Sequence, residues 1–354
     1  KKEKKIIPKV EDKDLVSIIM PAYNASELIG ESIRSVLAQS HPNWELIITN
    51  DASSDNTLEI IRQFKDDRIR VISLETNKGR AGARNTSLRE AKGTFLSFLD
   101  ADDLYEKNAL RNQLNFLKKN ETCDAVMGKW DRLSACGNNV FKTPQPKRKS
   151  GDIIDKHAFL FGNPTHPSSV VLKRDNIPSG HFFNEDAKAG EDWEYFASLG
   201  VNGFKFVVHD VVVSYYRMTD QARTKTNLQY AENMISVLDR IFDSLSEKGS
   251  PLFDYRNKAY YQVHAKMACR LYAVGSFVHG RALLEKGLKS ISNFEKQHSN
   301  LIAGSLSSWI RHLKVPNPHR ALVISTRMMP APIDRDFLYS ACCKRLMDLP
   351  DFSN

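Results

Sequence analysis

Two short acidic segments hold the side chains of this chain that are best suited to chemistry. In the first, Asp100, Asp102 and Asp103 lie within four positions, directly after the apolar run 94–99. Carboxylates this close repel one another, so their placement at a strand end is costly unless a cation lies among them. Hard oxygen ligands suit Mg²⁺ or Mn²⁺, which commonly also hold substrate phosphates. An acidic, solvated loop is the alternative when this motif is taken alone.

The second acidic segment is the pair Glu191–Asp192. It opens a predicted helix, where negative charge is favourable in itself. A glycine-rich turn, 77–82, opens another predicted helix, and the free N–H groups of a helix start favour a phosphate. Arg80 and Arg84 are four positions apart on that helix and therefore share one face. Each of these signals is weak by itself.

The elements that position these residues form an alternating pattern. Apolar runs at 16–20, 44–49, 69–74 and 94–99 predict strands, and amphipathic helical segments separate them. This alternation is typical of a parallel sheet covered by helices on both faces. In open sheets of that kind, ligands bind at the carboxyl ends of the strands. We therefore expect the polar clusters that follow the four runs to converge on one cleft.

The 354 residues favour two domains. Further strands are predicted at 124–130, 168–173, 204–208 and 211–216, with a polar loop at 134–151. Long helices are predicted from residue 228 onwards. We therefore divide the chain into a basic N-terminal segment (1–14), an α/β domain (15–219) and a helical C-terminal region (220–354).

Composition narrows the class of protein further. The formal net charge of +9 favours phosphate-rich partners, and five cysteines without metal-like spacing are typical of reduced thiols in the cytoplasm. No apolar run approaches the roughly 20 residues that span a bilayer, and no signal peptide is recognised. We expect a cytoplasmic protein, with peripheral contact at the membrane face as a candidate. Residues 301–313 have an amphipathic pattern that fits either a membrane surface or, more simply, a buried helix.

The motifs together resemble glycosyltransferase family 2, whose members have the GT-A fold. The resemblance covers residues 16–217 and rests on five motifs in order, at 16–24, 50–57, 77–85, 99–103 and 190–193. It implies a Rossmann-like, mostly parallel sheet flanked by helices, here followed by an α-helical extension. It also implies an inverting, metal-dependent enzyme that transfers a sugar from a nucleotide-diphosphate donor, with a UDP-sugar favoured. The acceptor would be a hydroxyl of a glycan or lipid-linked molecule in surface polysaccharide or glycoconjugate synthesis.

The resemblance also implies roles for single residues. Asp102 would ligate Mn²⁺ or Mg²⁺ directly, and Asp100 would contact the metal, its water or the ribose. Asp192 is expected as the general base, with Glu191 as the second candidate, and Asp51 as the partner of the nucleobase. The expected nucleotide-sugar site comprises Pro21, Tyr23, Asn24, Asp51, Asn77, Gly79, Arg84, Asn85, Asp100, Ala101 and Arg217.

Other functions fit the sequence less well. A sugar nucleotidyltransferase would need a glycine-rich basic loop after the first strand, where Pro21 to Asn24 stand instead. A nicotinamide dehydrogenase would need Gly-x-Gly-x-x-Gly at the same place. A nucleic-acid module would show basic residues interleaved with aromatics, so no nucleic-acid partner is expected. A catalytically degenerate GT-A binding module stays the main alternative. The helical region is a candidate for homo-oligomer contacts.

Overall fold

The computed structural model describes residues 14–143, 148–218, 228–292, 296–312 and 317–346. The chain forms two compact units. The first contains the residues up to 156 together with 163–187 and 191–218, and the second contains 157–162, 188–190 and the residues from 219 onwards. All but the last residue of the N-terminal segment 1–14 lies outside the described residues.

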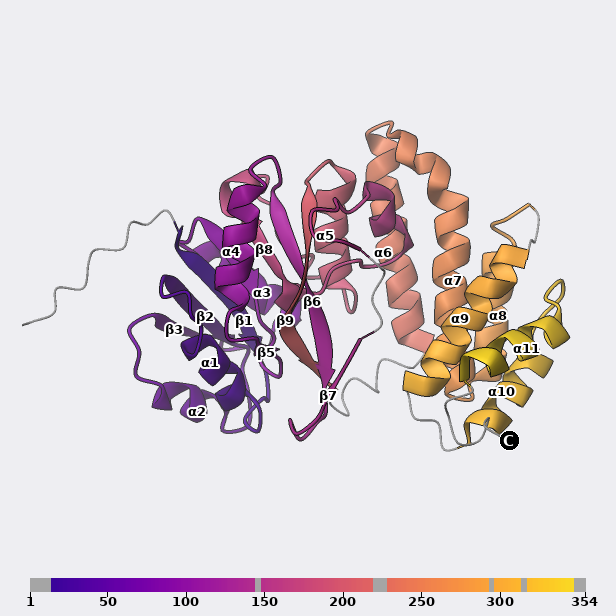
Figure 1. Ribbon diagram of the computed structural model, residues 1–354, viewed down its shortest axis with the longest axis horizontal. Helices are drawn as coiled ribbons and strands as arrows, with labels where there is room; N and C mark the ends of the chain where they lie inside the picture. The colour runs from indigo at the N-terminus through magenta and orange to yellow at the C-terminus, as the bar shows by residue number, and fades with distance from the viewer. Residues whose placement is uncertain (1–13, 144–147, 219–227, 293–295, 313–316, 347–354) are drawn as a thin grey trace, which may run out of the picture. The chain divides into compact units, whose positions relative to one another are not determined.

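The first unit is built on one mixed sheet (Figure 1). Within the described residues it has nine strands, in the order β3-β2-β1-β4-β8-β6-β9-β5, with β7 paired to β6. The strands are β1 (Val16–Ala22), β2 (Trp44–Asn50), β3 (Ile69–Ser73), β4 (Phe95–Phe98), β5 (Leu104–Tyr105), β6 (Ala125–Leu133), β7 (Val140–Phe141), β8 (Val170–Lys173) and β9 (Phe206–Arg217).

The sheet confirms the predicted α/β class and shows where it becomes mixed. Strands β3, β2, β1 and β4 are parallel neighbours, as their alternation with helices predicts. The inserted strand β8 runs antiparallel to both β4 and β6, while β6 and β9 are parallel. The carboxyl ends of β1, β2 and β4 therefore meet at one edge, which is the edge expected to carry the site.

Helices cover both faces of this sheet. They are α1 (Ile29–Leu37), α2 (Thr57–Gln63), α3 (Gly79–Glu90), α4 (Ala109–Lys119) and α5 (Glu191–Val201). Apolar residues of α1 and α4 form one core with Val16, Ile18 and Met20 of β1, and both helices lie in front of the sheet in Figure 1. Successive strand residues point to opposite faces. The other face is covered by α3, where Ser87 donates to the carbonyl of Ile47, and by α5, whose Phe196 packs edge-on against Phe98.

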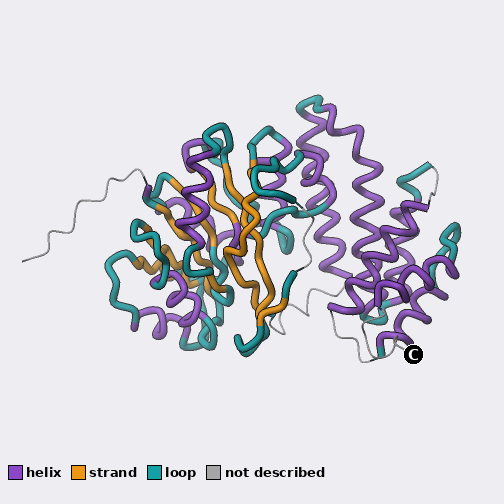
Figure 2. Tube along the Cα trace, viewed as in Figure 1, coloured by secondary structure: helices purple, strands orange, loops and turns teal. Residues whose placement is uncertain are grey.

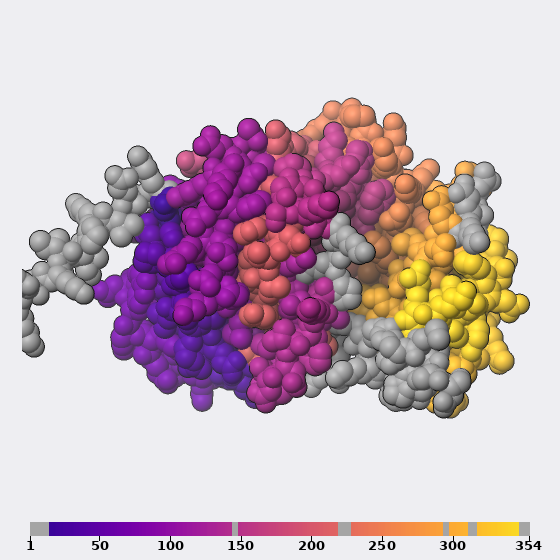
Figure 3. All heavy atoms as spheres, viewed as in Figure 1, coloured from indigo at the N-terminus to yellow at the C-terminus, as the bar shows by residue number. Residues whose placement is uncertain are grey.

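One long strand replaces two predicted ones. The predicted strands 204–208 and 211–216 are replaced by the single strand β9, which begins at Phe206 and whose pairing with β6 shifts register around Lys129. Gly128 lies at this irregularity, and a Cβ there would come within 2.5 Å of Val213, so the residue allows the strands to approach closely. The middle of β9 is partly open to solvent, and its salmon-coloured atoms are visible in Figure 3. The short strands β5 and β7 are absent from the sequence prediction, and β7 lies within the expected loop 134–151.

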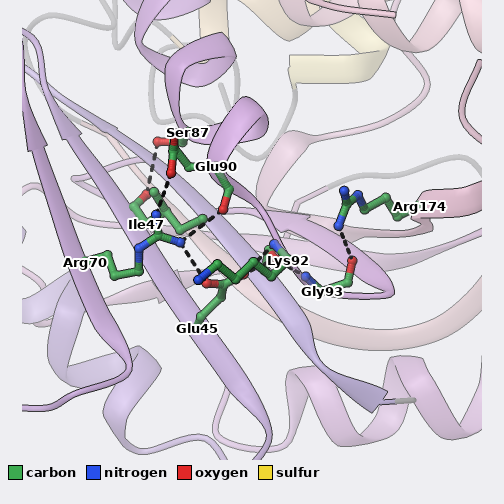
Figure 4. Close-up of polar contacts among 9 residues, drawn as sticks. Glu45, Ile47, Arg70, Ser87, Glu90, Lys92, Gly93 and Arg174 are labelled. Atoms are coloured by element: carbon green, nitrogen blue, oxygen red, sulfur yellow. Dashed lines mark hydrogen bonds and ion pairs between the residues drawn. The ribbon is translucent and has the colours of Figure 1, made fainter. Parts of the chain in front are cut away.

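A charged cluster at the opposite end of the strands is structural (Figure 4). Arg70 pairs with Glu45 at 3.3 Å and with Glu90 at 2.7 Å. Glu45 also accepts from the backbone N–H of Lys92 and from the hydroxyl of Ser17. These bonds tie β1, β2 and β3 to the end of α3 at the edge remote from the strand carboxyl ends.

The second unit contains only helices and loops among its described residues (Figure 2). Its α-helices are α6 (Leu228–Glu247), α7 (Arg256–Ala273), α8 (Phe277–Leu288), α9 (Lys296–His312), α10 (Pro318–Arg327) and α11 (Arg335–Leu346). Short 3₁₀ turns complete the two units, namely η2 (Lys156–Phe161), η3 (Pro167–Ser169), η4 (Arg174–Asn176) and η6 (Pro251–Tyr255).

The amphipathic segment 301–313 is a core helix in its described part. Ile302, Leu306 and Ile310 of α9 are buried among residues of α7 and α11. This burial confirms the simpler of the two interpretations of the apolar face. Among the described residues, the chain has no helix with the length and apolar character needed to cross a membrane.

Candidate active site

The turns that follow β1 and β2 are bonded to each other. Asn24 adopts a left-handed conformation (φ 47°), which asparagine tolerates better than most residues. Its side-chain oxygen accepts from the N–H of Ser54 at 2.8 Å, and its own N–H donates to Ser53 at 3.1 Å. The neighbouring Tyr23 is 52% exposed and Pro21 is buried in the strand. The structure thus places Tyr23 on the surface beside the end of β2, where it is accessible to a ligand.

Asp51 organises the glycine-rich turn. Its carboxylate accepts from the N–H of Lys78 at 2.7 Å, and its carbonyl accepts from the side-chain amide of Asn77 at 3.1 Å. Burial raises the pKa of the Asp51 carboxyl, against the lowering effect of the N–H groups of Lys78 and Gly79. Gly79 has a positive φ of 74° and begins α3. Asp51, Asn77 and Gly79 therefore lie together, as the sequence predicts.

The acidic turn after β4 separates into residues with different environments. The carbonyl of Ala101, a buried residue, accepts from Ser32 at 2.8 Å, whereas Asp100 and Asp102 are half-buried. Asp103 is fully buried; it accepts from Ser168 at 2.9 Å and from the N–H of Arg217 at 3.0 Å. Burial, followed by the charges of Asp102 and Asp100, raises the pKa of Asp103 well above its usual range. Asp103 thus fastens the acidic turn to η3 and to the end of β9.

Arg217 binds protein groups around this turn. Its Nε donates to the carbonyl of Asp102 at 2.9 Å, Nη1 to the carbonyl of Ala135 at 3.1 Å, and Nη2 to Glu31 at 2.5 Å. The Arg217 side chain is 1% exposed. These contacts favour a role in holding the acidic turn and the β6–β7 hairpin, rather than the direct diphosphate contact that the sequence suggests.

One buried arginine joins the two acidic segments. Arg84 Nη2 donates to Asp100 Oδ1 at 2.7 Å, and Nη1 donates to Glu191 Oε1 at 2.9 Å. The side chains of Arg84 and Glu191 are 1% and 5% exposed. Arg80 adds a second, half-exposed guanidinium, with Nε 3.3 Å from Glu191 Oε1. The start of α5 therefore lies beside the acidic turn after β4.

Ion pairing keeps both carboxylates of this network charged. Burial acts to raise the pKa of Asp100, but the Arg84 guanidinium outweighs it and lowers that pKa to about 2. Burial also acts on Glu191, and the two arginines likewise lower its pKa below the usual value. A carboxylate held in this way is a weak proton acceptor. The next residue, Asp192, is half-buried and accepts from the neutral amide of Asn163 at 3.1 Å.

Asn85 anchors the segment that leads to α5. Its side-chain amide donates to the carbonyl of Phe183 at 2.8 Å and to Glu185 at 2.9 Å, and its oxygen accepts from the N–H of Phe183. The ring of Phe183 also lies 5.3 Å from the Arg84 guanidinium. Arg84 and Asn85 both contact the α5 side of the site, a role that the nucleotide-binding expectation did not include.

Three histidines of the first unit, which could in principle bind a metal, occupy different places. His209 stacks on Phe116 at 4.2 Å, and His181 bonds the carbonyl of Tyr195. His166 lies by the acidic turn, with Nε2 3.9 Å from Asp103 Oδ2 and its ring against Trp130. Among the described residues, no three His, Cys, Asp or Glu side chains are grouped as a metal site. Asp100 and Asp102 are the half-buried carboxylates of this turn, whereas Asp103 is fully buried.

Sequence reasoning missed the residues that support the acidic turn from a distance. Ser168, Asn163 and Glu31 contact Asp103, Asp192 and Arg217, respectively. They are 65, 29 and 186 positions away from these partners. No spacing pattern identifies such pairs, because the antiparallel insertion of β8 and the return of β9 create the contacts.

The fold and the arrangement of these residues define a class of protein. A Rossmann-like mixed sheet, an acidic turn after β4 and a carboxylate pair at the start of α5 are the features of a GT-A glycosyltransferase domain. Residues 17–172 match the sequence profile of Glycosyl transferase family 2. The UDP-Glc:alpha-D-GlcNAc-diphosphoundecaprenol beta-1,3-glucosyltransferase WfaP of Escherichia coli is 32% identical over 205 residues, which cover 58% of this chain and 78% of that protein. The chain belongs to glycosyltransferase family 2.

Two other proteins show different degrees of likeness. WfgD of Escherichia coli, described by the same activity as WfaP, is 50% identical over 109 residues, which cover 31% of this chain and 43% of WfgD. The chain thus aligns with less than half of that relative. The mannosyltransferase PcManGT of Pyrobaculum calidifontis, solved with GDP-Man and Mn²⁺, is 19% identical with a TM-score of 0.55, and the match covers 95% of this chain and 88% of that one. At this identity the likeness concerns the fold.

Proposed function

We propose that this chain is an inverting, metal-dependent glycosyltransferase that uses a nucleotide-diphosphate sugar, with a UDP-sugar favoured. The acceptor is a hydroxyl of a glycan or lipid-linked molecule in surface polysaccharide or glycoconjugate synthesis. The observation that carries this proposal is the Arg84 bridge, because it places the start of α5 beside the acidic turn after β4. The names of WfgD and WfaP, both UDP-glucose transferases acting on lipid diphosphates, support the donor and acceptor classes.

The nucleotide end of the donor has three candidate contacts. Tyr23 offers an exposed ring at the end of β1 for the base. The carboxylate of Asp51 can accept from the ring N–H of uracil, which gives base selectivity. The start of α3 at Gly79 offers helix N–H groups and a favourable dipole for a phosphate.

The donor set of the acidic turn fits a divalent cation. Asp100 and Asp102 supply hard oxygen atoms on a short turn, which suits Mn²⁺ or Mg²⁺. Mutual repulsion between the carboxylates contributes to the raised pKa of Asp103, and a cation would relieve it. A divalent ion bound here with the donor would neutralise charge on the leaving diphosphate. The Mn²⁺ bound to PcManGT supports this cofactor class.

Asp192 is the proposed general base. Its carboxylate accepts from the amide of Asn163, whereas the Glu191 side chain is 5% exposed and held by two guanidiniums, so Glu191 offers little of its carboxylate to an acceptor hydroxyl. It takes the proton from the acceptor hydroxyl as that oxygen attacks the anomeric carbon. A single base opposite the leaving diphosphate gives one displacement and inversion of the anomeric configuration.

The experiment that tests this function is a calorimetric titration of UDP, GDP, dTDP and CDP, each with and without Mn²⁺. We expect tight, metal-dependent binding of one nucleotide. Asp102→Asn should weaken that binding, whereas Asp192→Asn should retain it and lose transfer. If the folded protein bound none of the four nucleotides, a degenerate GT-A binding module would be the better description. Full activity of Asp192→Asn would refute the base assignment.

A further inference from the structure

The buried guanidinium of Arg84 has two arms that end on two different functional segments. One arm reaches Asp100 at the end of β4 and the other reaches Glu191 in the first turn of α5. The guanidinium is planar and rigid, so its two N–H arms fix the distance between the groups that they bind. The position of α5 is therefore tied to the position of the acidic turn.

The contacts of Glu191 agree with a holding role. Its Oε1 is bonded to Arg84 at 2.9 Å and lies 3.3 Å from Arg80, and its side chain is 5% exposed. Little of this carboxylate is open to an incoming hydroxyl. Asp192 follows directly in the chain, so any displacement of Glu191 also moves the backbone that carries Asp192.

Other contacts on α3 leave this connection little freedom. Asn85 holds the backbone of Phe183 through two hydrogen bonds, and the Phe183 ring lies against Arg84. Gly82 lies one turn earlier on α3, where a Cβ would come within 2.5 Å of Lys78. α3 is therefore bonded through Asn85 to the segment at Phe183, next to the arginine that reaches both acidic segments.

We propose that Arg84 and Glu191 are positioning residues that couple the donor-binding turn to the base, so that binding at Asp100 sets the place of Asp192. This inference rests on the proposed function. In this proposal Glu191 positions Asp192 and is not itself the base, although the two residues are neighbours in the chain. Arg84 acts through the two carboxylates and need not touch the donor.

The test compares Glu191→Gln with Glu194→Gln, a matched substitution one turn further along α5, where the carboxylate accepts from Asn184. Two quantities are measured: the affinity for UDP with Mn²⁺ by calorimetry, and kcat against pH with UDP-sugar donors. We expect Glu191→Gln to weaken UDP binding about threefold to tenfold and to lower kcat about 10- to 100-fold. An acidic limb should persist in the pH profile of kcat, because the base is retained. Glu194→Gln should leave both quantities close to those of the unchanged protein.

Each other outcome decides against a defined part of the argument. UDP affinity and kcat that are both unchanged in Glu191→Gln would overturn the coupling. Loss of transfer to background in Glu191→Gln, together with activity in Asp192→Asn, would make Glu191 the base. If Glu191→Gln fails to fold, Glu191→Asp and Arg84→Lys serve in its place. The first shortens the acidic side chain and the second removes the planar guanidinium, while both keep the charge. Each should lower both the UDP affinity and kcat. If the unchanged protein binds no nucleotide, the proposed function fails before the coupling is tested.

Discussion

Replacing Arg217 by lysine distinguishes a positioning role from contact with the donor diphosphate. The substitution keeps the positive charge but removes the planar group that reaches Asp102, Ala135 and Glu31. An ammonium cannot span all three acceptors from one position. The acidic turn and the β6–β7 hairpin should therefore lose a shared support.

The magnitude follows from the burial of each contact. Hydrogen bonds from a charged donor contribute about 1.5–3 kcal/mol when they are well buried. The two carbonyl contacts come from a guanidinium that is 1% exposed, whereas Glu31 is 45% exposed, so that pair adds only about 0–1 kcal/mol. If lysine keeps one of the two carbonyl bonds, we expect the free energy of unfolding of the first unit to fall by about 1.5–4 kcal/mol.

Hydrogen–deuterium exchange measures the loss of stability caused by Arg217→Lys. Peptides from 100–105 and from β9 both belong to the first unit, and their exchange rates report the free energy of local opening there. Calorimetry measures UDP and uridine affinities in parallel. We expect faster exchange in both peptides and weaker metal-dependent UDP binding, and Glu31→Gln should cause less than about 1 kcal/mol of change. Unchanged exchange with a selective loss of UDP over uridine binding would refute this reasoning and restore the diphosphate contact.

Three further changes test separate parts of the site. Burial in the folded protein raises the pKa of Asp103 above the ordinary value of 3.8. This carboxyl therefore lowers the free energy of unfolding progressively as pH rises from 3.8 through the pKa of the folded state. Urea denaturation without metal measures the free energy of unfolding of Asp103→Asn and of the unchanged protein at several pH values. The free energy of the variant should rise relative to that of the unchanged protein as pH rises. A difference that stays constant with pH would contradict a buried carboxyl that binds a proton in the folded state. Gly79→Ala should cost about 1–2 kcal/mol in the same assay, since φ is positive and no atom lies within 4 Å of the new Cβ; equal stability would show that the turn adopts another conformation. Asp51→Asn should weaken UDP binding about tenfold by calorimetry, by loss of a charged hydrogen bond; unchanged affinity would remove Asp51 from base recognition.

The sequence predicted the part of the fold in which neighbours in the chain are neighbours in space. Strands β1 to β4 alternate with helices, so their parallel pairing follows from period and polarity, although β4 pairs with β1 and not with β3. The second half of the sheet did not follow, because β8 is inserted antiparallel between β4 and β6, and β9 is one bent strand instead of two. A polar interruption at 209–210 looks like a loop in sequence but is an irregular part of a strand in the structure.

The candidate site divides in the same way. Residues that follow parallel strands, such as Asp51 and Asn77, could be brought together from sequence. The functions of Arg84, Asn85 and Arg217 could not, because each depends on partners about 80 to 190 positions away in the chain. The sequence shows which of these side chains carry a charge, but it does not show which partner group each of them binds in the fold. In the structure, two motif positions expected to bind nucleotide, Arg84 and Asn85, contact the segments around α5.

In the acidic turn after β4, the partners that the fold supplies change what is expected of the divalent cation. In the sequence, the three carboxylates of this turn indicate a metal ion, yet in the structure Asp103 is buried with two hydrogen-bond donors and Asp100 is paired with Arg84. Both carboxylates thus have partners within the protein, although the charges of Asp102 and Asp100 still raise the pKa of Asp103. On the proposed function, a divalent ion would gain most of its ligands when the donor diphosphate arrives. We expect Mn²⁺ alone to bind weakly and Mn²⁺ with UDP to bind tightly, as calorimetry would show. Tight binding of Mn²⁺ without nucleotide would mean that the carboxylates, and not the donor, supply the cation site.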